Sequence, residues 1–251
     1  MSITPNNQAY ISIKLSNVVE EILFQIGALY VNSKLHNAVM CLNSTNTFIK
    51  ESKIFEERDI DNYTIITDSK KDHTIVPYGH NIMLSGTFAS FRAYDDDTLE
   101  FMRTFVYSNE DYMYSAYNSY NMIKGINSDD DMVCIYYDDD NQDDLSYYKK
   151  ALLLANKKNV IIFSRDASKL QKIFTALPYN FKVVWEEDVW TRLILLSFFK
   201  NNIVQYDKSS FSLWAAYLSK YDSYKTVIVP HNVSDILNKN INNLNIVDVS
   251  A

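Results

Sequence analysis

Glycine is scarce in this sequence: four of its 251 residues are glycine, where average usage of about 7% would give about 17. A loop that cradles phosphate groups needs closely spaced glycines, because backbone amides must approach the anion. The two nearest glycines are Gly79 and Gly86, and no Lys-Ser or Lys-Thr pair follows the second. The sequence therefore excludes both the P-loop and the GxGxxG fingerprint as phosphate-binding devices.

Cysteine, histidine and basic residues are also few. The two cysteines, Cys41 and Cys134, lie in separate apolar segments, which predicts buried free thiols and excludes a zinc ribbon. The four histidines show neither HxxxH nor HExxH spacing, so no structural zinc site is expected. With 24 Lys and Arg against 31 Asp and Glu, the net charge is -7, and no basic stripe is present. This balance argues against nucleic acid as a partner.

Long apolar runs are missing as well. No run approaches the ~20 residues of a membrane span, and the N-terminus lacks the basic and apolar regions of a signal peptide. We therefore expect a cytoplasmic protein with no membrane span. The abundance of Asn, Tyr, Lys, Ile and Asp is typical of an AT-rich genome, such as that of a low-GC microbe or a giant DNA virus. A viral origin would place the protein in the virus factory or the virion.

Apolar residues follow a strand–helix alternation in both halves of the chain. Residues Tyr10–Leu15, Val18–Tyr30 and Ala38–Leu42 predict a β-α-β opening, which favours a parallel sheet. The C-terminal half predicts five strands alternating with four helices, at Met132–Tyr136, Leu145–Lys157, Asn159–Phe163, Ser168–Ala176, Phe181–Trp185, Val189–Lys200, Ile203–Val204, Ser209–Leu218 and Thr226–Val229. The fold class expected is α/β, with two Rossmann-like halves, the second a doubly wound parallel sheet.

A polar stretch at Asn127–Asp131 places the domain boundary between residues 126 and 127, giving domains 1–126 and 127–251. The apolar residues Ile241, Leu244 and Ile246 predict that the Asn-rich tail docks on the domain.

Ligands of doubly wound folds bind beyond the carboxyl ends of the strands. Arg165 follows one predicted strand, so its guanidinium is a candidate for binding a ligand phosphate, or else a surface group paired with Asp166 or Glu186. The hydroxyls of Ser209, Ser210 and Ser212 open the last helix. A helix N-terminus lined with hydroxyls and amides is an anion site that needs no glycine. The alternative is an ordinary serine cap, with Phe211 and Trp214 in the core.

Three acidic triplets occur at Asp95–Asp97, Asp129–Asp131 and Asp138–Asp140. Paired carboxylates at the end of a strand suit Mg²⁺ or Mn²⁺ carrying a diphosphate, and Asp138 and Asp140 follow an apolar strand. The alternative for each triplet is a solvated turn or a helix cap. Apart from this weaker metal hypothesis, no metal or cofactor is expected.

Several segments resemble the α-1,2-fucosyltransferase family (glycosyltransferase family 11). The order Asn201–Val204, Ser209–Leu218 and Lys225–Pro230 is similar to the C-terminal block of that family, which reads roughly KHNIIANSSFSWWGAWL and then NKIVIAP. Further similarity lies at Ile82–Ser90, Tyr147–Leu152, Val160–Ser164 and, in spacing, Ile11–Leu42. The resemblance implies a GT-B fold and transfer of fucose from GDP-fucose to a glycan hydroxyl. It places the nucleotide-sugar donor on domain 127–251 and the acceptor on domain 1–126. The donor-binding candidates are then Gln25, Arg165, Ser209, Ser210 and Ser212, and no catalytic residue is assigned.

The sequence departs from that family at both donor-binding motifs. The family opening GGLGNQxFQ corresponds to Asn17–Gln25, which has lost the glycines and the asparagine. The arginine of the family motif HxRRGDY, which holds the GDP diphosphate, should follow Val133, where the sequence reads Cys134–Asp140 without any arginine. Three hypotheses follow: an inverting, metal-independent transferase; an inactive relative (a pseudoenzyme) that serves as a scaffold or binds a protein partner, for example in a virus particle; and a transferase that uses a metal at Asp138 and Asp140.

Overall fold

The computed structural model describes residues 8–42, 46–56, 63–67, 81–88, 91, 93–137, 145–165, 168, 179–204, 210–219, 225–231 and 244–249. The contacts divide the chain into two compact units, Met1–Phe105 and Val106–Ala251. The division falls inside helix α3 (Asp96–Tyr107), whereas the sequence places it after residue 126. The reason is that the next helix, α4 (Glu110–Lys124), packs against α7 (Val189–Ser197) of the second unit.

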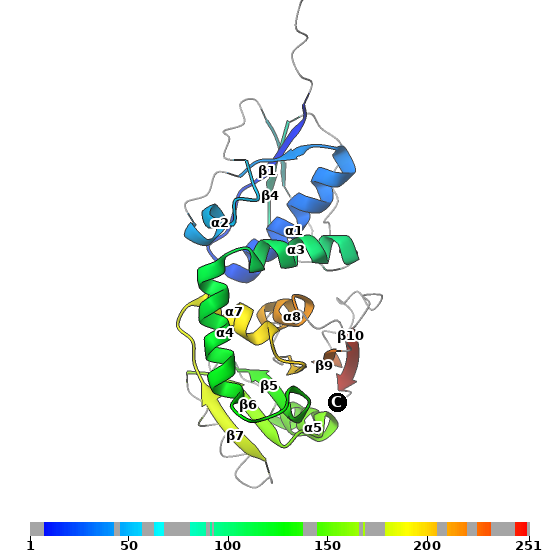
Figure 1. The fold of residues 1–251 in the computed structure, drawn as a ribbon. Coiled ribbons are helices and arrows are strands. Elements are labelled where there is room, and N and C mark those ends of the chain that lie inside the picture. Colours follow the sequence, from blue (N-terminus) through cyan, green and yellow to red (C-terminus); the bar gives the residue numbers. More distant parts are fainter. Residues whose placement is uncertain are drawn as a thin grey trace, which may run out of the picture. The chain divides into compact units, whose positions relative to one another are not determined.

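The first unit is built on a four-stranded parallel sheet with strand order β2-β1-β4-β3. Figure 1 labels its strands β1 and β4. Strand β1 pairs in parallel with both β2 and β4, so the predicted β-α-β opening is confirmed. Helix α1 buries Ile22, Leu23, Ile26 and Leu29, which recur at helical spacing. The elements of this unit are β1 (Tyr10–Ile13), α1 (Val19–His36), β2 (Val39–Met40), α2 (Thr47–Ser52), β3 (Thr64–Thr67), β4 (Asn81–Ser85) and most of α3.

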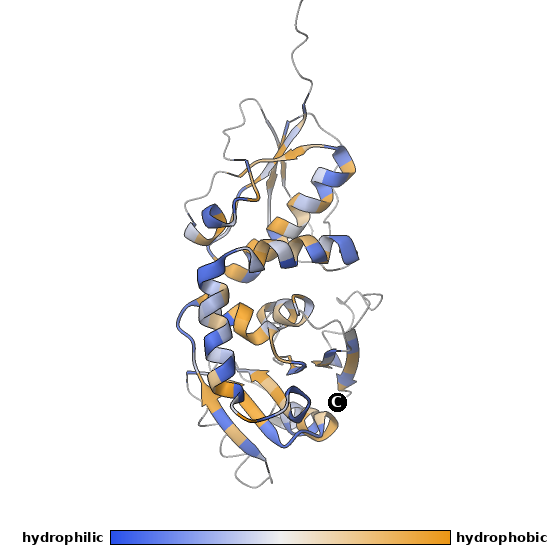
Figure 2. Cartoon of the chain, viewed as in Figure 1, coloured by the Kyte–Doolittle hydropathy of each residue, from blue (hydrophilic) through white to orange (hydrophobic). Residues whose placement is uncertain are grey.

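The second unit contains a six-stranded parallel sheet with strand order β10-β9-β8-β5-β6-β7. Its further elements are η1 (Asp129–Asp131), β5 (Met132–Tyr136), α5 (Leu145–Ala155), β6 (Asn159–Phe163), β7 (Asn180–Val184), β8 (Asn201–Ile203), α8 (Ser210–Tyr217), β9 (Lys225–Pro230) and β10 (Leu244–Val249). Every residue of β5 is buried, as expected for a central strand with both faces covered. Figure 2 shows β5 and most of α7 in hydrophobic colours. The fold class predicted from the sequence is confirmed, and the helix predicted at Ser168–Ala176 lies, apart from Ser168, outside the described residues.

The last described segment forms a strand. Strand β10 pairs with β9 in parallel over its whole length, from Leu244 opposite Lys225 to Val249 opposite Pro230. The predicted docking of the tail is therefore confirmed for the strand Leu244–Val249, while Ile241 lies outside the described residues. Both cysteines are buried thiols, as predicted. Among the helices that the structure describes, none has the length and hydropathy to cross a bilayer.

Candidate functional site

The strand order of the second unit creates a switch point in its sheet. From the centre, β5, β6 and β7 extend the sheet one way, and β8, β9 and β10 extend it the other way. This is the 3-2-1-4-5-6 order of nucleotide-binding doubly wound folds, which bind ligands beyond the carboxyl ends of the strands where the order reverses. Tyr137 follows β5 and Val204 follows β8 at this edge. The connecting residues 138–144 and 205–209 lie outside the described residues.

Five side chains form an arginine–aromatic cluster at the carboxyl edge of the sheet: Tyr136, Arg165, Trp185, Arg192 and Phe211. The rings of Tyr136 and Phe211 lie 5.0 Å apart, and the Arg192 guanidinium lies 5.7 Å from the Phe211 ring and 4.2 Å from the Trp185 ring. The guanidinium of Arg165 lies 4.8 Å from the same Trp185 ring. The cluster therefore joins the ends of β5, β6 and β7 to helix α7 and to the first turn of α8, across the switch point.

Arg192 is the member of this cluster that the sequence did not reveal. Its side chain projects from α7, a helix whose residues from Trp190 to Ser197 are all buried, and the residue is 7% exposed. Its Nε and Nη1 atoms have no hydrogen-bond partner, and no carboxylate of the described chain forms an ion pair with it. The signal available in the sequence was a single charged residue in a largely apolar helix, because charged residues are rarely buried unless paired.

Arg165, predicted from the sequence as a phosphate contact, lies just beyond β6. Its side chain is 71% exposed, and its Nη2 atom lies 3.6 Å from a carboxylate oxygen of Glu187. Arg165 thus forms a surface ion pair, as the alternative interpretation of the sequence expected. Its partner is Glu187, whereas the sequence suggested Asp166 or Glu186. A contact between Arg165 and a donor phosphate stays a prediction.

The serine-rich start of α8 was the second predicted anion site. Ser210 is the first residue of α8 and is half-buried, Ser212 is buried, and Ser209 lies outside the described residues. Phe211 and Trp214 are core residues, at 2% and 0% exposure. The predicted helix is confirmed, and a contact of these serines with a donor stays a prediction.

Gln25, the candidate in the first unit, is buried in α1. Its Nε2 donates hydrogen bonds to the carbonyl oxygens of Lys14 (3.2 Å) and Gly86 (2.7 Å), and its Oε1 accepts one from the Ser16 amide (2.8 Å). The side chain thereby ties α1 to the ends of β1 and β4. Its predicted role in donor binding is untested by these contacts.

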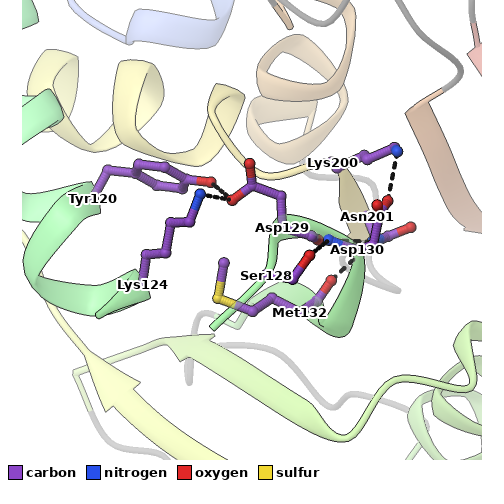
Figure 3. Close-up of polar contacts among 8 residues, drawn as sticks. All are labelled: Tyr120, Lys124, Ser128, Asp129, Asp130, Met132, Lys200 and Asn201. Carbon is purple, nitrogen blue, oxygen red and sulfur yellow. Dashed lines mark hydrogen bonds and ion pairs between the residues drawn. The ribbon is translucent and has the colours of Figure 1, made fainter. Parts of the chain in front are cut away.

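Asp129–Asp131, one of the acidic triplets, has a structural role. It forms η1 ahead of β5, at the sheet edge opposite to the cluster, where Asp129 accepts a hydrogen bond from Tyr120 and pairs with Lys124 (2.7 Å) (Figure 3). Asp130 pairs with Lys200, and this hydrogen bond lowers the pKa of the Asp130 carboxyl. The triplet therefore fastens α4 and the start of β8 to the amino end of β5.

Of the other two acidic triplets, Asp95–Asp97 belongs to the described residues and Asp138–Asp140 does not. Asp95 precedes α3 and caps it, and Asp97 binds Lys34 and Tyr30. Asp138 and Asp140, the alternative metal ligands, lie outside the described residues. Among the residues that are described, no group of three His, Cys, Asp or Glu side chains is placed to hold a metal ion.

The Asp95 cap gives a prediction about stability and pH. Asp95 Oδ1 accepts hydrogen bonds from Thr98 N (2.8 Å) and Thr98 Oγ1 (2.6 Å), and these bonds lower its pKa. Because the folded pKa lies below the unfolded value of about 3.9, the stabilisation is present above that pH and is lost as the pH falls through the folded pKa. Asp95→Ala should cost about 1 kcal/mol at pH 7, a difference that narrows below about pH 4. Urea unfolding of wild type and variant between pH 7 and about pH 3 measures this difference in stability. Asp95→Asn is the matched control, since its neutral cap should cost little at either pH; an Asp95→Ala loss that stays constant with pH would contradict the prediction.

Solved structures of fucosyltransferases share this fold. The fucosyltransferase NodZ from Bradyrhizobium matches with a TM-score of 0.59 at 8% identity, over 84% of this chain and 92% of that chain. A mutant of Arabidopsis thaliana FUT1 in complex with GDP gives 0.56 at 10% identity, over 84% of this chain and 68% of that chain. POFUT1 in complex with GDP-fucose gives 0.53 at 9% identity, over 91% of this chain and 99% of that chain.

At the level of sequence, no protein-family model and no curated protein matches the chain. The structural likeness, at 8–10% identity, establishes the fold: α/β of the GT-B type with two parallel sheets. The fucosyltransferase-like architecture expected from the sequence is confirmed. Membership of the α-1,2 family in particular stays a prediction, because the similar structures include the α-1,6-fucosyltransferase NodZ.

Proposed function

We propose that the protein is a glycosyltransferase of the fucosyltransferase type. It binds a nucleotide-sugar, GDP-fucose by analogy with the similar structures, at the carboxyl edge of the six-stranded sheet and transfers the sugar to a glycan hydroxyl. The observation that carries this proposal is the arginine–aromatic cluster at the switch point. It sets two cations and three aromatic rings where doubly wound folds bind nucleotides.

The chemistry of the cluster suits the donor. A nucleoside diphosphate carries negative charge on the diphosphate and presents a flat base. Arg165 and Arg192 supply positive charge, and Tyr136, Trp185 and Phe211 supply aromatic faces. We assign the donor to the second unit on this basis, and the glycan acceptor to the first unit. Ser210 and Ser212 lie on α8, whose N-terminus favours an anion through the aligned backbone dipoles.

The proposed reaction is an inverting displacement. An acceptor hydroxyl oxygen forms a bond to the anomeric carbon of the sugar, and the bond from that carbon to the β-phosphate oxygen breaks. The nucleoside diphosphate leaves with the bonding electron pair, and the hydroxyl proton is released. Charge builds up on the departing diphosphate, so positive groups beside it stabilise the transition state more than the ground state.

Calorimetry with GDP-fucose and GDP tests the proposal, with and without Mn²⁺ and a chelator. We expect GDP-fucose to bind with a Kd between about 1 μM and 1 mM, unaffected by the chelator, and GDP to be released when glycan acceptors are added. Binding that needs Mn²⁺ and is lost in Asp138→Ala would support the metal-dependent alternative and overturn the metal-independent mechanism. Failure to bind any nucleotide-sugar would contradict the enzyme and leave the inactive scaffold as the explanation.

A further inference from the structure

The buried guanidinium of Arg192 lacks a counter-charge in the described structure. An arginine side chain stays charged in proteins, so this charge cannot be removed by loss of the proton. Removing an ion from water into a protein interior costs several kcal/mol unless a partner of opposite charge is present. The aromatic faces of Trp185 and Phe211 compensate for part of this cost. An anion bound beside Nε and Nη1 would compensate for the rest of this free-energy cost of burial.

The carboxylates nearest to Arg192 in the sequence make other contacts. Glu187 pairs with Arg165, and Asp188 Oδ1 caps α7 by accepting a hydrogen bond from Thr191 N at 2.7 Å. Glu186 Oε1 accepts a hydrogen bond from Asp188 N at 3.1 Å. None of the three forms an ion pair with Arg192, so its counter-ion is not supplied by this loop.

Two further hydrogen-bond donors, at the neighbouring ends of β6 and β7, are also buried without a partner. Trp185 Nε1 and Ser164 Oγ are buried and unpartnered in the same way as Arg192 Nε and Nη1. Ser164 and Trp185 follow the register pair Phe163–Val184, so they are adjacent at the ends of β6 and β7. Phe211, in the first turn of α8, brings the positive end of that helix to the same cluster. Donors without acceptors, beside a helix N-terminus, favour an anion with several oxygens.

We propose that Arg192, with Trp185 and the start of α8, forms a diphosphate site. This inference rests on the proposed function and deepens it. Helix α7 supplies the guanidinium that the family resemblance places after β5, where this chain has no arginine. The ligand is the diphosphate of the nucleotide-sugar, and inorganic pyrophosphate shares its chemistry. Because the ligand-free protein carries an unpaired buried charge, binding and folding stability are linked.

Arg192→Met tests the site, because methionine keeps the apolar stem and removes the charge. Without ligand, we expect a melting temperature equal to or above that of the wild type, since an unpaired buried cation has been removed. Pyrophosphate and GDP should raise the melting temperature of the wild type, and raise that of the variant much less at the same ligand concentration. The Kd of both ligands should rise about 10- to 100-fold, the loss expected for hydrogen bonds to a charged group. All measurements are made at matched ionic strength, with calorimetry and thermal melting.

Arg103→Met is the matched control, because Arg103 lies on α3 and pairs with Glu100. It should leave the affinity for pyrophosphate unchanged. Arg192→Lys, which keeps the charge without the planar fork, should show an intermediate loss and replaces the methionine variant should that variant fail to fold. A change in Trp fluorescence on adding pyrophosphate, abolished in Trp185→Phe, would support binding at the cluster.

The outcomes separate this site from the proposed activity. Pyrophosphate binding that depends on Arg192, without turnover of GDP-fucose, would support the site and overturn the enzyme. Turnover of GDP-fucose with equal affinities in wild type and Arg192→Met would overturn the site and leave the enzyme standing. A wild type that does not bind pyrophosphate, or an Arg192→Met variant that melts well below wild type with an unchanged ligand shift, would show that Arg192 is structural.

Discussion

Replacing Gly27 by valine should destabilise the first unit by about 3 kcal/mol or more. Gly27 lies in α1, and a Cβ atom there would sit 2.5 Å from the hydroxyl oxygen of Tyr94 and 2.6 Å from its Cζ. Tyr94 is 1% exposed, donates a hydrogen bond to Phe24 O (2.9 Å) and packs edge-on against Phe91. Since the ring is held by these contacts, the added atoms must displace the helix or break the hydrogen bond.

Urea unfolding, with hydrogen exchange of the α1 amides, measures this effect. Gly27→Ala tests the sign: alanine normally stabilises a helix by about 1 kcal/mol over glycine, whereas here it should destabilise. Gly125→Ala is a control with nothing within 4 Å of its added Cβ, where only a φ of +53° opposes the substitution. A Gly27→Ala protein more stable than the wild type would refute the close contact.

Replacing Tyr147 by alanine should cost the second unit about 3–5 kcal/mol. Tyr147 projects from α5, is 3% exposed and belongs to a core cluster with Tyr148, Ile203 and Ile228. Its hydroxyl lies 2.8 Å from Val204 O and 3.1 Å from Ile228 O, at the carboxyl ends of β8 and β9. The side chain therefore joins α5 to the sheet edge at which the candidate site lies.

Tyr147→Phe separates the ring from the hydroxyl. It should cost about 1 kcal/mol, because it removes one buried hydrogen bond and keeps the packing. Leu153→Ala is the control on the same helix, since Leu153 is 60% exposed, and it should change stability by less than about 0.5 kcal/mol. The denaturant midpoints of the three variants, compared with that of the wild type, measure these losses of stability. Equal losses for Tyr147→Phe and Tyr147→Ala would mean that the ring contributes no packing energy.

The sequence predicts most of the second unit because its strands are short apolar runs between helices. Met132–Tyr136 and Asn159–Phe163 match β5 and β6 residue for residue, since a buried parallel strand needs apolar side chains on both faces. The position of the division between the units depends on α4, whose partner α7 is distant in sequence. A pattern read along the chain does not contain that contact.

The candidate site shows the same limit. The carboxyl edge, Arg165 and the start of α8 follow from the order of predicted strands and helices. Arg192 does not, because its significance depends on burial beside Trp185 and Phe211, which three separate elements bring together. Likewise, Gln25 reads as a family motif, while its hydrogen bonds to Lys14 and Gly86 appear only in the folded unit.

The strand order also determines when each strand can pair as the chain is synthesised. Strands β5, β6 and β7 can pair as they emerge, but the other edge of β5 is completed only when β8 brings Asn202 opposite Cys134. Such distant pairings form slowly, because the intervening chain must be closed into a loop first. Arg192 precedes β8 and Phe211 follows it, so the contact between these two side chains forms late. If a nucleotide-sugar binds at the proposed site, it would therefore stabilise the finished sheet and would have no effect on the first steps of its folding.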